Sequence, residues 1–559
     1  MITRENALKE LTAAPFDVVV IGGGVTGAGV ALDAASRGYS TAIVERNDWA
    51  IGTSSRSSKM VHGGLRYLQS FDLGLVREAL LERSLMVELA PHLVYPTPYL
   101  VPRLGDDRKD RLLGIGLNMY DVMATARVPG RRQKLEKGEQ EAWAPDRHRT
   151  IPAEEVLELI PALEPRDPKS AYLFYDCQTD DVRLVLTILG EAERFGAVMA
   201  NRLDVTGLID RKGRAAGVVC RCAESGDTIE IEAANVVNAT GVWADRIRPE
   251  EILDETEVPR IAPSRGTHVT VSADLLPLNG AACIVPAGEG RMIFALPWYG
   301  RALLGTTDND YDGDIDRVQP GDDDIDYILN ATNDYFKTSI ERSDLTGAYA
   351  GVRPLISTGD PKKSVDISRK AELYETSSGL LTITGGKLTT WRKMAELVVD
   401  RIADRESRVL PCRTTDIPLG MEQQQGDSDL DGTLDAERLP EGALDQLSFR
   451  YGHAARNVLG LAAEDSALCA PIVAGHPDLL AEVVIAARLE QARSVGDILL
   501  RRTRLALTDA PALRTAESVR PVAELLGAEL GWDQKRITAE SEAWVEELAA
   551  EGCDPAGAA

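Results

Sequence analysis

One short segment of the chain concentrates residues that can carry chemistry. Residues 54–69 read SSRSSKMVHGGLRYLQ, with four serines, a lysine, a histidine, two glycines and two arginines. Hydroxyl and ammonium groups can hold an anionic ligand, and an imidazole with an unperturbed pKa of about 6.5 can remove a proton at neutral pH. A buried strand or an amphipathic helix would carry more apolar residues. The segment is therefore predicted to be a loop that surrounds a ligand.

A dinucleotide-binding unit precedes this loop. FDVVVIG (16–22) is an unbroken apolar run, typical of a strand buried on both faces. It leads into Gly22, Gly24 and Gly27 with G-x-G-x-x-G spacing, then an alanine-rich helix and a second strand that ends at Glu45. The glycines allow a tight turn, close approach of a pyrophosphate and close helix–strand packing, and the helix N-terminus offers free N–H groups. Glu45 stands where an acid accepts ribose hydroxyl groups. A merely structural glycine turn would leave Glu45 unexplained, so dinucleotide binding is predicted.

Two later segments favour FAD over NAD. ANVVNATG (234–241) is a strand that runs into a glycine turn, and GLLTITGGKLTTWRKMAELVVDRI (379–402) is a strand, a glycine pair and a helix. A second helix N-terminus directed at the cofactor would stabilise negative charge on a reduced flavin ring. A bare NAD domain has no need of this late return of the chain. The predicted cofactor is FAD.

The motifs now resemble a known family. GGGVTGAG, TSSRSSKMVHGGLRYL, NATGVW, TTDNDYDGD, GVRPL and GGKLTTWRK, in this order, closely resemble the FAD-dependent glycerol-3-phosphate dehydrogenases. The resemblance is continuous from residue 16 to about residue 405 and looser over the helical remainder. It implies oxidation of sn-glycerol 3-phosphate to dihydroxyacetone phosphate by hydride transfer from C2 to flavin N5, with the electrons passed to a quinone.

The loop in 54–69 gains a role in a flavoprotein of this design. Its serines and lysine would donate hydrogen bonds to the pyrophosphate and the ring, and its glycines would let the backbone approach the ring. The expected FAD contacts are Gly22, Gly24, Gly27, Glu45, Arg46, Thr53, Ser54, Ser57, Ser58, Lys59, Gly63, Gly64, Thr240, Gly241, Gly385, Gly386, Lys387, Leu388 and Thr389.

A base and a phosphate site complete the expected reaction. His62 is predicted to take the proton from the C2 hydroxyl, and His268, at the start of a strand in SRGTHVTV, either competes for that role or caps a sheet edge. Arg353 precedes Pro354 in AGVRPL, which favours an extended backbone, and the motif match makes it a catalytic and substrate-binding residue. Its expected companions at the substrate are Arg66, Tyr67, Arg369 and Lys387. A surface ion pair is the alternative for Arg353 and Arg369.

One segment imitates a calcium loop. DNDYDGDIDRVQ (308–319) fits the D-x-D-x-D-G pattern, but Gln319 replaces the bidentate glutamate and the preceding ALLGTT is strand-like rather than helical. Residues 306–308 also match the family's own T-T-D turn. No metal site is predicted.

The predicted fold is α/β. A Rossmann-like FAD-binding domain (14–80, 150–245 and 345–408) and an antiparallel-sheet substrate or cap domain (81–149 and 246–344) together resemble glutathione-reductase/D-amino-acid-oxidase-like flavoproteins. The second domain is expected to form the substrate lid, with a hairpin turn at WYGR. A polar linker (409–430) and a helical C-terminal domain (431–550) follow; interface formation is the expected use of the latter.

Composition limits the partners. The chain has 559 residues and a formal net charge of −26, which opposes nucleic-acid binding because phosphate contacts need clustered lysine and arginine. Seven scattered cysteines without C-x-x-C suit a reducing cytoplasm, and neither a signal peptide nor a membrane-spanning run is expected. We expect a cytoplasmic homodimer whose membrane contact, if made, is peripheral on the inner face.

Rival activities share these motifs. The chain could be a glycerol-3-phosphate oxidase that uses oxygen, or an amine or hydroxy-acid oxidase on the same fold. A flavin-fold scaffold that binds a partner without turnover is the alternative from another class. His62 with Arg66 and Arg353 opposes the scaffold reading, because binding alone does not require a base beside a phosphate site.

Overall fold

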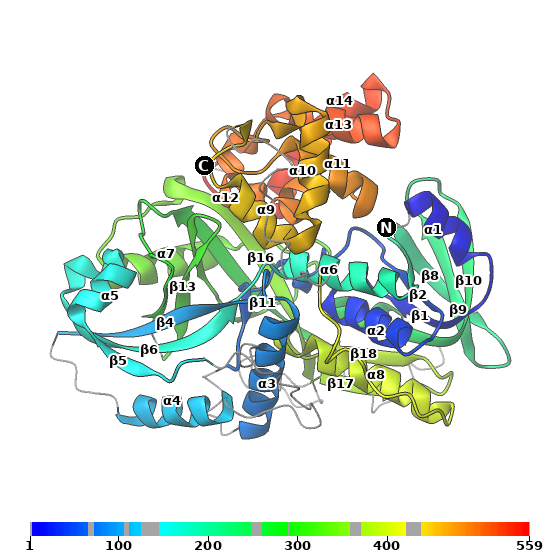
Figure 1. The fold of residues 1–559 in the computed structure, drawn as a ribbon, viewed down its shortest axis with the longest axis horizontal. Helices are drawn as coiled ribbons and strands as arrows, with labels where there is room; N and C mark the ends of the chain where they lie inside the picture. The colour runs from blue at the N-terminus through cyan, green and yellow to red at the C-terminus, as the bar shows by residue number, and fades with distance from the viewer. Residues whose placement is uncertain are drawn as a thin grey trace, which may run out of the picture.

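The computed structural model describes residues 3–64, 72–105, 111–124, 145–247, 260–288, 290–357, 371–420 and 438–557. These residues form two large sheets and a group of C-terminal helices that lies against both (Figure 1).

The first sheet carries the predicted dinucleotide unit. Its strands are β17 (Ala371–Glu375), β18 (Leu381–Gly385), β10 (Thr228–Asn238), β1 (Phe16–Ile21), β2 (Thr41–Val44) and β7 (Val198–Ala200), in that spatial order, with β9 (Ala215–Cys222) and β8 (Leu203–Asp210) extending from β10. The strands from β18 to β7 pair in parallel. Their unbroken apolar runs reflect burial on both faces.

Helices cover one face of this sheet. Helix α2 (Val25–Ser36) lies between α6 (Asp181–Arg194) and α8 (Trp391–Arg405). Gly27 of α2 packs directly on the glycine turn, since a Cβ there would lie 1.9 Å from the carbonyl oxygen of Gly22. Helix α1 (Arg4–Leu11) packs near β7. The strand, glycine turn and helix predicted at residues 16–36 are confirmed.

The second sheet is mainly antiparallel. Its strand order is β15 (Asn309–Asp310), β11 (Arg260–Ser272), β14 (Arg301–Gly305), β13 (Met292–Trp298), β12 (Ala282–Pro286), β4 (Tyr95–Leu104), β6 (Pro168–Gln178) and β3 (Met60–Val61), with β16 (Leu345–Ser357) beside β11 and β5 (Arg149–Pro152) beside β6. The predicted hairpin at WYGR is confirmed: Tyr299 and Gly300, both at positive φ, join β13 to β14. The helices associated with this sheet are α3 (Leu73–Leu89), α4 (Arg111–Ala124), α5 (Ala153–Leu159) and α7 (Asp322–Phe336).

Sheet membership differs from the predicted domain division at three segments. β3, inside the predicted FAD-binding range 14–80, pairs with β6 of the second sheet. The predicted FAD-binding domain includes residues 150–178, but β5 and β6 belong to the second sheet because β6 pairs with β4. Residues 345–357 likewise form β16, which pairs with β11. Apolar alternation along a strand predicts a strand without naming its partner, so these assignments needed the tertiary structure.

The C-terminal part is helical, as predicted. It comprises α9 (Ala443–Tyr451), α10 (Ala455–Glu464), α11 (Leu480–Leu489), a π-helical turn (Asp497–Arg502), α12 (Leu505–Thr508), α13 (Ala516–Leu530) and α14 (Gln534–Glu551). It contacts the second sheet closely: the Leu507 carbonyl accepts a hydrogen bond of 2.6 Å from Thr270 Oγ1, and a Cβ at Gly347 would lie 2.3 Å from the same oxygen. The first part of the predicted linker also packs, because Ile417 and Leu419 are buried.

Among the residues described, none of the helices combines the length and the apolar character that a membrane span requires.

Candidate active site

A large cavity lies where the two sheets meet. Its volume is about 1260 Å³, and its lining comes from the glycine turn after β1, the loop before β3, the ends of β10 and β18, and strands of the second sheet. Small-molecule pockets usually measure about 300–1,000 Å³, so this cavity has room for a dinucleotide and a second ligand.

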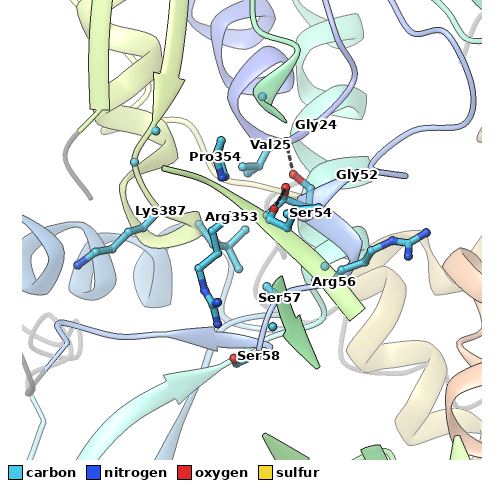
Figure 2. A pocket seen from close by; sticks show the side chains of 18 of the residues that line it. Gly24, Val25, Gly52, Ser54, Arg56, Ser57, Ser58, Arg353, Pro354 and Lys387 are labelled. Atoms are coloured by element: carbon cyan, nitrogen blue, oxygen red, sulfur yellow. Dashed lines mark hydrogen bonds between the residues drawn. The ribbon is translucent and has the colours of Figure 1, made fainter. Parts of the chain in front are cut away.

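The glycine turn forms one end of the cavity. Gly22, at φ +109°, passes so close to β10 that a Cβ would lie 2.7 Å from the carbonyl oxygen of Ala239. Gly24 caps helix α2 without any side-chain hydrogen bond, and the first turn of α2 carries no acidic residue. Ser54 Oγ accepts a 2.9 Å hydrogen bond from the Val25 N–H (Figure 2). The helix N-terminus therefore faces the cavity with the positive end of its dipole, as a pyrophosphate requires.

Glu45 lies at the end of β2 and lines the same end. Its carboxylate accepts the N–H groups of Gly23 at 2.7 Å and Asn47 at 2.8 Å, so it also holds the glycine turn. Burial raises the pKa of Glu45. Arg46 lines the cavity as well, with its guanidinium 5.3 Å from the centre of the Trp243 ring and ion-paired with Asp316.

The serine-rich loop enters the cavity only in part. Among its residues predicted to contact FAD, the cavity is lined by Thr53, Ser54, Ser57, Ser58 and Gly64. Lys59 does not line it: its ammonium group is fully buried, donates to the Ser55 carbonyl oxygen and pairs with Asp181 at 2.8 Å.

Two predicted cofactor contacts in this loop are therefore corrected. A buried cation needs a buried anion, and Asp181 supplies it; neither side chain belongs to the cavity lining. Gly63 is also absent from the lining; a Cβ there would lie 2.5 Å from Leu80 and 2.7 Å from the Tyr120 hydroxyl, so this glycine permits close packing instead. Gly27 serves packing too, which is the reason given for the third glycine of the motif.

Segments from β10 and β18 close the cavity on another side. The lining here includes residues that the sequence predicts to contact FAD: Thr240, Gly241, Gly385, Gly386, Lys387, Leu388 and Thr389. A short 3-10 helix, Leu388–Thr390, precedes α8, so a second helical N-terminus faces the cavity. The Thr389 hydroxyl bonds to the backbone N–H and carbonyl of His62, at 3.2 and 3.3 Å, and so joins this segment to the loop after β3.

Two histidines line the cavity in different settings. His62 lies in the loop after β3, half-buried. His268 is on β11 and only 2% exposed; its Nε2 lies 2.8 Å from Ser58 Oγ, and its ring stacks on Tyr349 at 4.7 Å and 11°. Burial, with the charges of Lys59 and Arg353, lowers the pKa of His268 well below its usual value. His268 is therefore a neutral imidazole at neutral pH.

Arg353 projects from β16 into the same region. Its guanidinium contacts Asp308 Oδ1 at 3.2 Å and the Thr307 carbonyl oxygen at 3.1 Å, and one quarter of the side chain is exposed. Arg353 extends toward Ser58, and Lys387 lines another part of the same cavity (Figure 2). Arg66, Tyr67 and Arg369, the other predicted substrate ligands, lie outside the described residues.

Some residues at this site were not predicted. Ser264, Gly266 and His268 alternate along β11 and so share one face; Ser264 Oγ lies 3.4 Å from Arg353, and Gly266 leaves space for its guanidinium, which a Cβ would approach to 2.6 Å. The period-two spacing in SRGTH could have indicated both residues once His268 was a candidate.

The segment with the calcium-like pattern has other partners. Asp308 accepts from Ser264 and Arg353, and Asp316 pairs with Arg46 and Arg246. Within the described ranges, no group of three or more His, Cys, Asp or Glu side chains is arranged to hold a metal ion.

The residues present fit FAD. The phosphates and a ribose are provided for by three features: a helix N-terminus whose cap residue, Gly24, adds no side chain, a glycine turn closed to any side chain, and a carboxylate at the end of β2. The second helical N-terminus, at Leu388, provides a positive dipole for a ring that becomes anionic on reduction.

Comparisons with known proteins agree with this geometry. A family model described as FAD dependent oxidoreductase matches residues 17–392, and one described as the C-terminal domain of alpha-glycerophosphate oxidase matches residues 385–537. Glycerol-3-phosphate dehydrogenase 2 of Mycobacterium tuberculosis is 36% identical over 96% of this chain and 88% of its own length. The aerobic glycerol-3-phosphate dehydrogenase of Bacillus subtilis is 33% identical over 96% and 95%.

A solved structure extends the likeness to the fold. The crystal structure of the glycerol-3-phosphate dehydrogenase from Bacillus halodurans complexed with FAD superposes with a TM-score of 0.77, at 29% identity, and covers 99% of this chain and 98% of that one. The α/β flavoprotein fold with a helical C-terminal domain is thereby confirmed.

Glu45→Ala is expected to lower FAD retention, because the ribose loses an acceptor and the glycine turn loses the bond to Gly23. Glu45→Gln keeps one acceptor oxygen and should fall between the parent and Glu45→Ala. The ratio of flavin to protein absorbance after gel filtration measures the loss. Equal FAD content in all three proteins would show that Glu45 does not contact the cofactor.

Proposed function

The chain belongs to the FAD-dependent glycerol-3-phosphate dehydrogenases, and from this premise we propose that it oxidises sn-glycerol 3-phosphate at C2 and passes the electrons from FAD to a quinone. The main support for the proposal is that His268 and Arg353 line the same cavity. The other end of this cavity is formed by the glycine turn, which suits a dinucleotide. A neutral imidazole beside a guanidinium suits a substrate that has both a hydroxyl group to deprotonate and a phosphate to hold.

Bound FAD supplies the chemistry of hydride acceptance from C2. The chain's own part is to hold the cofactor through the glycine turn, Glu45 and the segment 385–389, and to place the substrate carbon against it. Positioning of this kind can account for a large share of a barrier reduction. The division into a FAD-binding and a substrate domain that we propose follows the two sheets.

Arg353 is the proposed phosphate ligand. Its planar fork can bind two phosphate oxygens at once, and Asp308 with the Thr307 carbonyl orients the guanidinium before the substrate arrives. Lys387 lines the same cavity, and Arg66, Tyr67 and Arg369 are proposed companions from the motif match. A local cluster of bases is necessary because a protein with a net charge of −26 repels an anionic substrate at long range.

We propose His268 as the base, with His62 as the competing assignment. The support is orientation: Ser58 and Tyr349 fix the imidazole of His268 from two sides. His268 and Arg353 also lie on the paired strands β11 and β16, and both line the cavity. The prediction from sequence that His62 is the base stays a prediction.

The electron acceptor is proposed to be a quinone reached at a membrane surface. Ile115, Met119 and Val122 lie on one face of helix α4 and are 58, 38 and 69% exposed. The first two also line the cavity, so an apolar surface reaches its edge. This is the face we propose for peripheral contact with the inner side of the cell membrane, measurable by co-sedimentation with vesicles. A homodimer is likewise proposed and is tested by light scattering.

The deciding experiment is anaerobic addition of sn-glycerol 3-phosphate to the purified yellow protein. The flavin absorbance should bleach, and a soluble quinone should reoxidise the enzyme much faster than dissolved oxygen does. Stoichiometric hydrogen peroxide would favour the oxidase instead. A colourless protein, or a flavin that the substrate leaves oxidised, would contradict the proposed reaction.

His268→Ala should slow flavin reduction by about 10²- to 10⁴-fold with little change in substrate affinity, because a base acts mainly in the transition state. In the parent, the rate should hold as the pH falls through about 6.5, since the lowered pKa keeps His268 neutral there. Single-turnover stopped-flow reduction measures both. His476, which pairs with Asp509 away from the cavity, offers a control in His476→Ala. The assignment reverses if His62→Ala is the more damaging variant.

Arg353→Ala should weaken substrate binding by about 10- to 100-fold while FAD stays bound, because one or more charge-assisted hydrogen bonds of about 1.5–3 kcal/mol are lost. Arg353→Lys should restore only part, since a point charge cannot reproduce the guanidinium fork. Arg265 is a matched control: it follows Ser264 on β11, is 24% exposed against 25% for Arg353, and pairs with Asp324 outside the cavity lining. Equal affinities in Arg353→Ala and Arg265→Ala would remove Arg353 from the site.

A further inference from the structure

A compact cluster of charges is buried behind the cavity wall. Asp180 and Asp181 begin helix α6, and each has a fully buried carboxylate. Two fully buried cations face them: Lys59 of the serine-rich loop and Arg504 of the C-terminal helical part. Two anions and two cations balance, which is the condition under which such a group can be buried at all.

Arg504 joins both carboxylates from the C-terminal side. Its Nε lies 3.2 Å from Asp180 Oδ2, its Nη2 lies 3.0 Å from Asp180 Oδ1, and Nη2 also donates to Asp181 Oδ1. Nη1 donates to the Leu500 carbonyl at 3.0 Å, so the guanidinium is fixed in its own segment too. Arg504 itself has φ +67°, an uncommon conformation for a residue with a side chain.

Asp181 in turn holds the serine-rich loop. Its Oδ2 accepts from the Ser57 N–H at 3.1 Å, from Ser57 Oγ at 2.7 Å and from Lys59 Nζ at 2.8 Å. This one carboxylate oxygen therefore holds the N–H and hydroxyl groups of Ser57 and the ammonium group of Lys59, the two residues that flank Ser58. Ser57 and Ser58 are among the residues of this loop that line the cavity.

The loop then fixes His268 through two contacts. Ser58 Oγ lies 2.8 Å from His268 Nε2. Tyr349, whose ring stacks on His268, donates its hydroxyl to the Ser57 carbonyl at 2.8 Å. The Lys59 ammonium lies 4.7 Å from the centre of the same Tyr349 ring, and the face of an aromatic ring attracts a cation.

From this chain of contacts we propose that Arg504 is a positioning residue for the reaction: through Asp180 and Asp181 it fixes Ser57, Ser58 and Lys59, and thereby the orientation of His268. The inference rests on the proposed function, in which His268 receives the substrate proton. It assigns to the C-terminal helices a part in the chemistry, beyond the formation of interfaces.

Arg502 is a control residue that distinguishes this positioning role from a contribution to general stability. It is as deeply buried as Arg504, lies two residues before it, and also joins the C-terminal part to the first sheet's loops, through Asp48 at 2.7 and 2.9 Å. The other partner of its side chain is Glu490, and its backbone carbonyl, which a substitution keeps, accepts from Arg183 at 2.9 Å. None of the described bonds of the Arg502 side chain leads to the serine-rich loop or to His268.

The test compares Arg504→Lys with Arg502→Lys in the full chain with FAD bound. A lysine at 504 cannot bridge two carboxylates as the fork does, so the loop should shift. We expect flavin reduction by sn-glycerol 3-phosphate to slow by about 10- to 100-fold in Arg504→Lys, with substrate affinity changed by less than about threefold, because a small displacement of the reacting groups costs rate before affinity. Arg502→Lys should lower the melting temperature similarly and leave the reduction rate near that of the parent.

Coupling to Ser58 gives an independent readout. If Arg504 acts through the Ser58–His268 contact, Arg504→Lys combined with Ser58→Ala should cost less than the product of the two single effects. If Arg504→Lys does not fold, Asp181→Asn interrupts the same path one step later, and the same slowing is expected.

Three results would overturn the inference. They are an unchanged reduction rate in a folded Arg504→Lys or Asp181→Asn variant, equal slowing in Arg504→Lys and Arg502→Lys, and fully multiplicative effects with Ser58→Ala. A parent enzyme whose flavin is not reduced by the substrate contradicts the proposed function itself, which distinguishes that failure from failure of the inference.

Discussion

The burial of carboxylates is the constraint on which the assembly of this protein depends. Asp48, Asp180, Asp181 and Asp497 are fully buried, and an isolated buried charge is too costly to persist. The cations that compensate them include three arginines of one short C-terminal segment: Arg501, Arg502 and Arg504. Removing one partner of such a pair typically costs about 3–5 kcal/mol. The C-terminal helices are therefore tied electrostatically to the interior of the flavin-binding part.

The cavity depends on contacts between segments that are far apart in the chain. The glycine turn after β1 is closed by Ala239 at the end of β10, and the loop after β3 is joined to Thr389. Parallel strands bring their carboxyl ends to one edge of a sheet, where ligands of α/β proteins bind. The second sheet then supplies His268 and Arg353 from the neighbouring strands β11 and β16, whose pairing places Ser264 opposite Arg353.

Local electrostatics differ from those of the whole molecule. The net charge of −26 would repel a phosphate ester, yet Arg353 stands in the cavity with its fork oriented by Asp308 and Thr307. Short-range contacts in a partly closed site are screened least by salt and dominate over the distant charges. Local charges also act on His268: burial and two nearby cations lower its pKa.

By itself, the sequence determined the parts whose signal is local. The strand, glycine turn and helix at residues 16–36, the hairpin at Tyr299–Gly300 and the helical C-terminal part follow from periodicity and turn chemistry within a few residues. The motifs also predicted FAD and the family without knowledge of any tertiary contact.

Only the tertiary structure decided which residues meet. It placed β6 and β16 in the second sheet, paired Lys59 with the buried Asp181, and brought Arg504 to the same carboxylate, which holds the serine-rich loop. The physical reason is that strand pairing and the neutralisation of buried charge depend on partners far away in the chain. β6 pairs with β4 and β16 with β11, while Lys59 and Asp181 are 122 residues apart and Arg504 and Asp180 are 324 residues apart. A local sequence pattern indicates which chemical group a residue carries, but it does not indicate which partner neutralises the charge of that group.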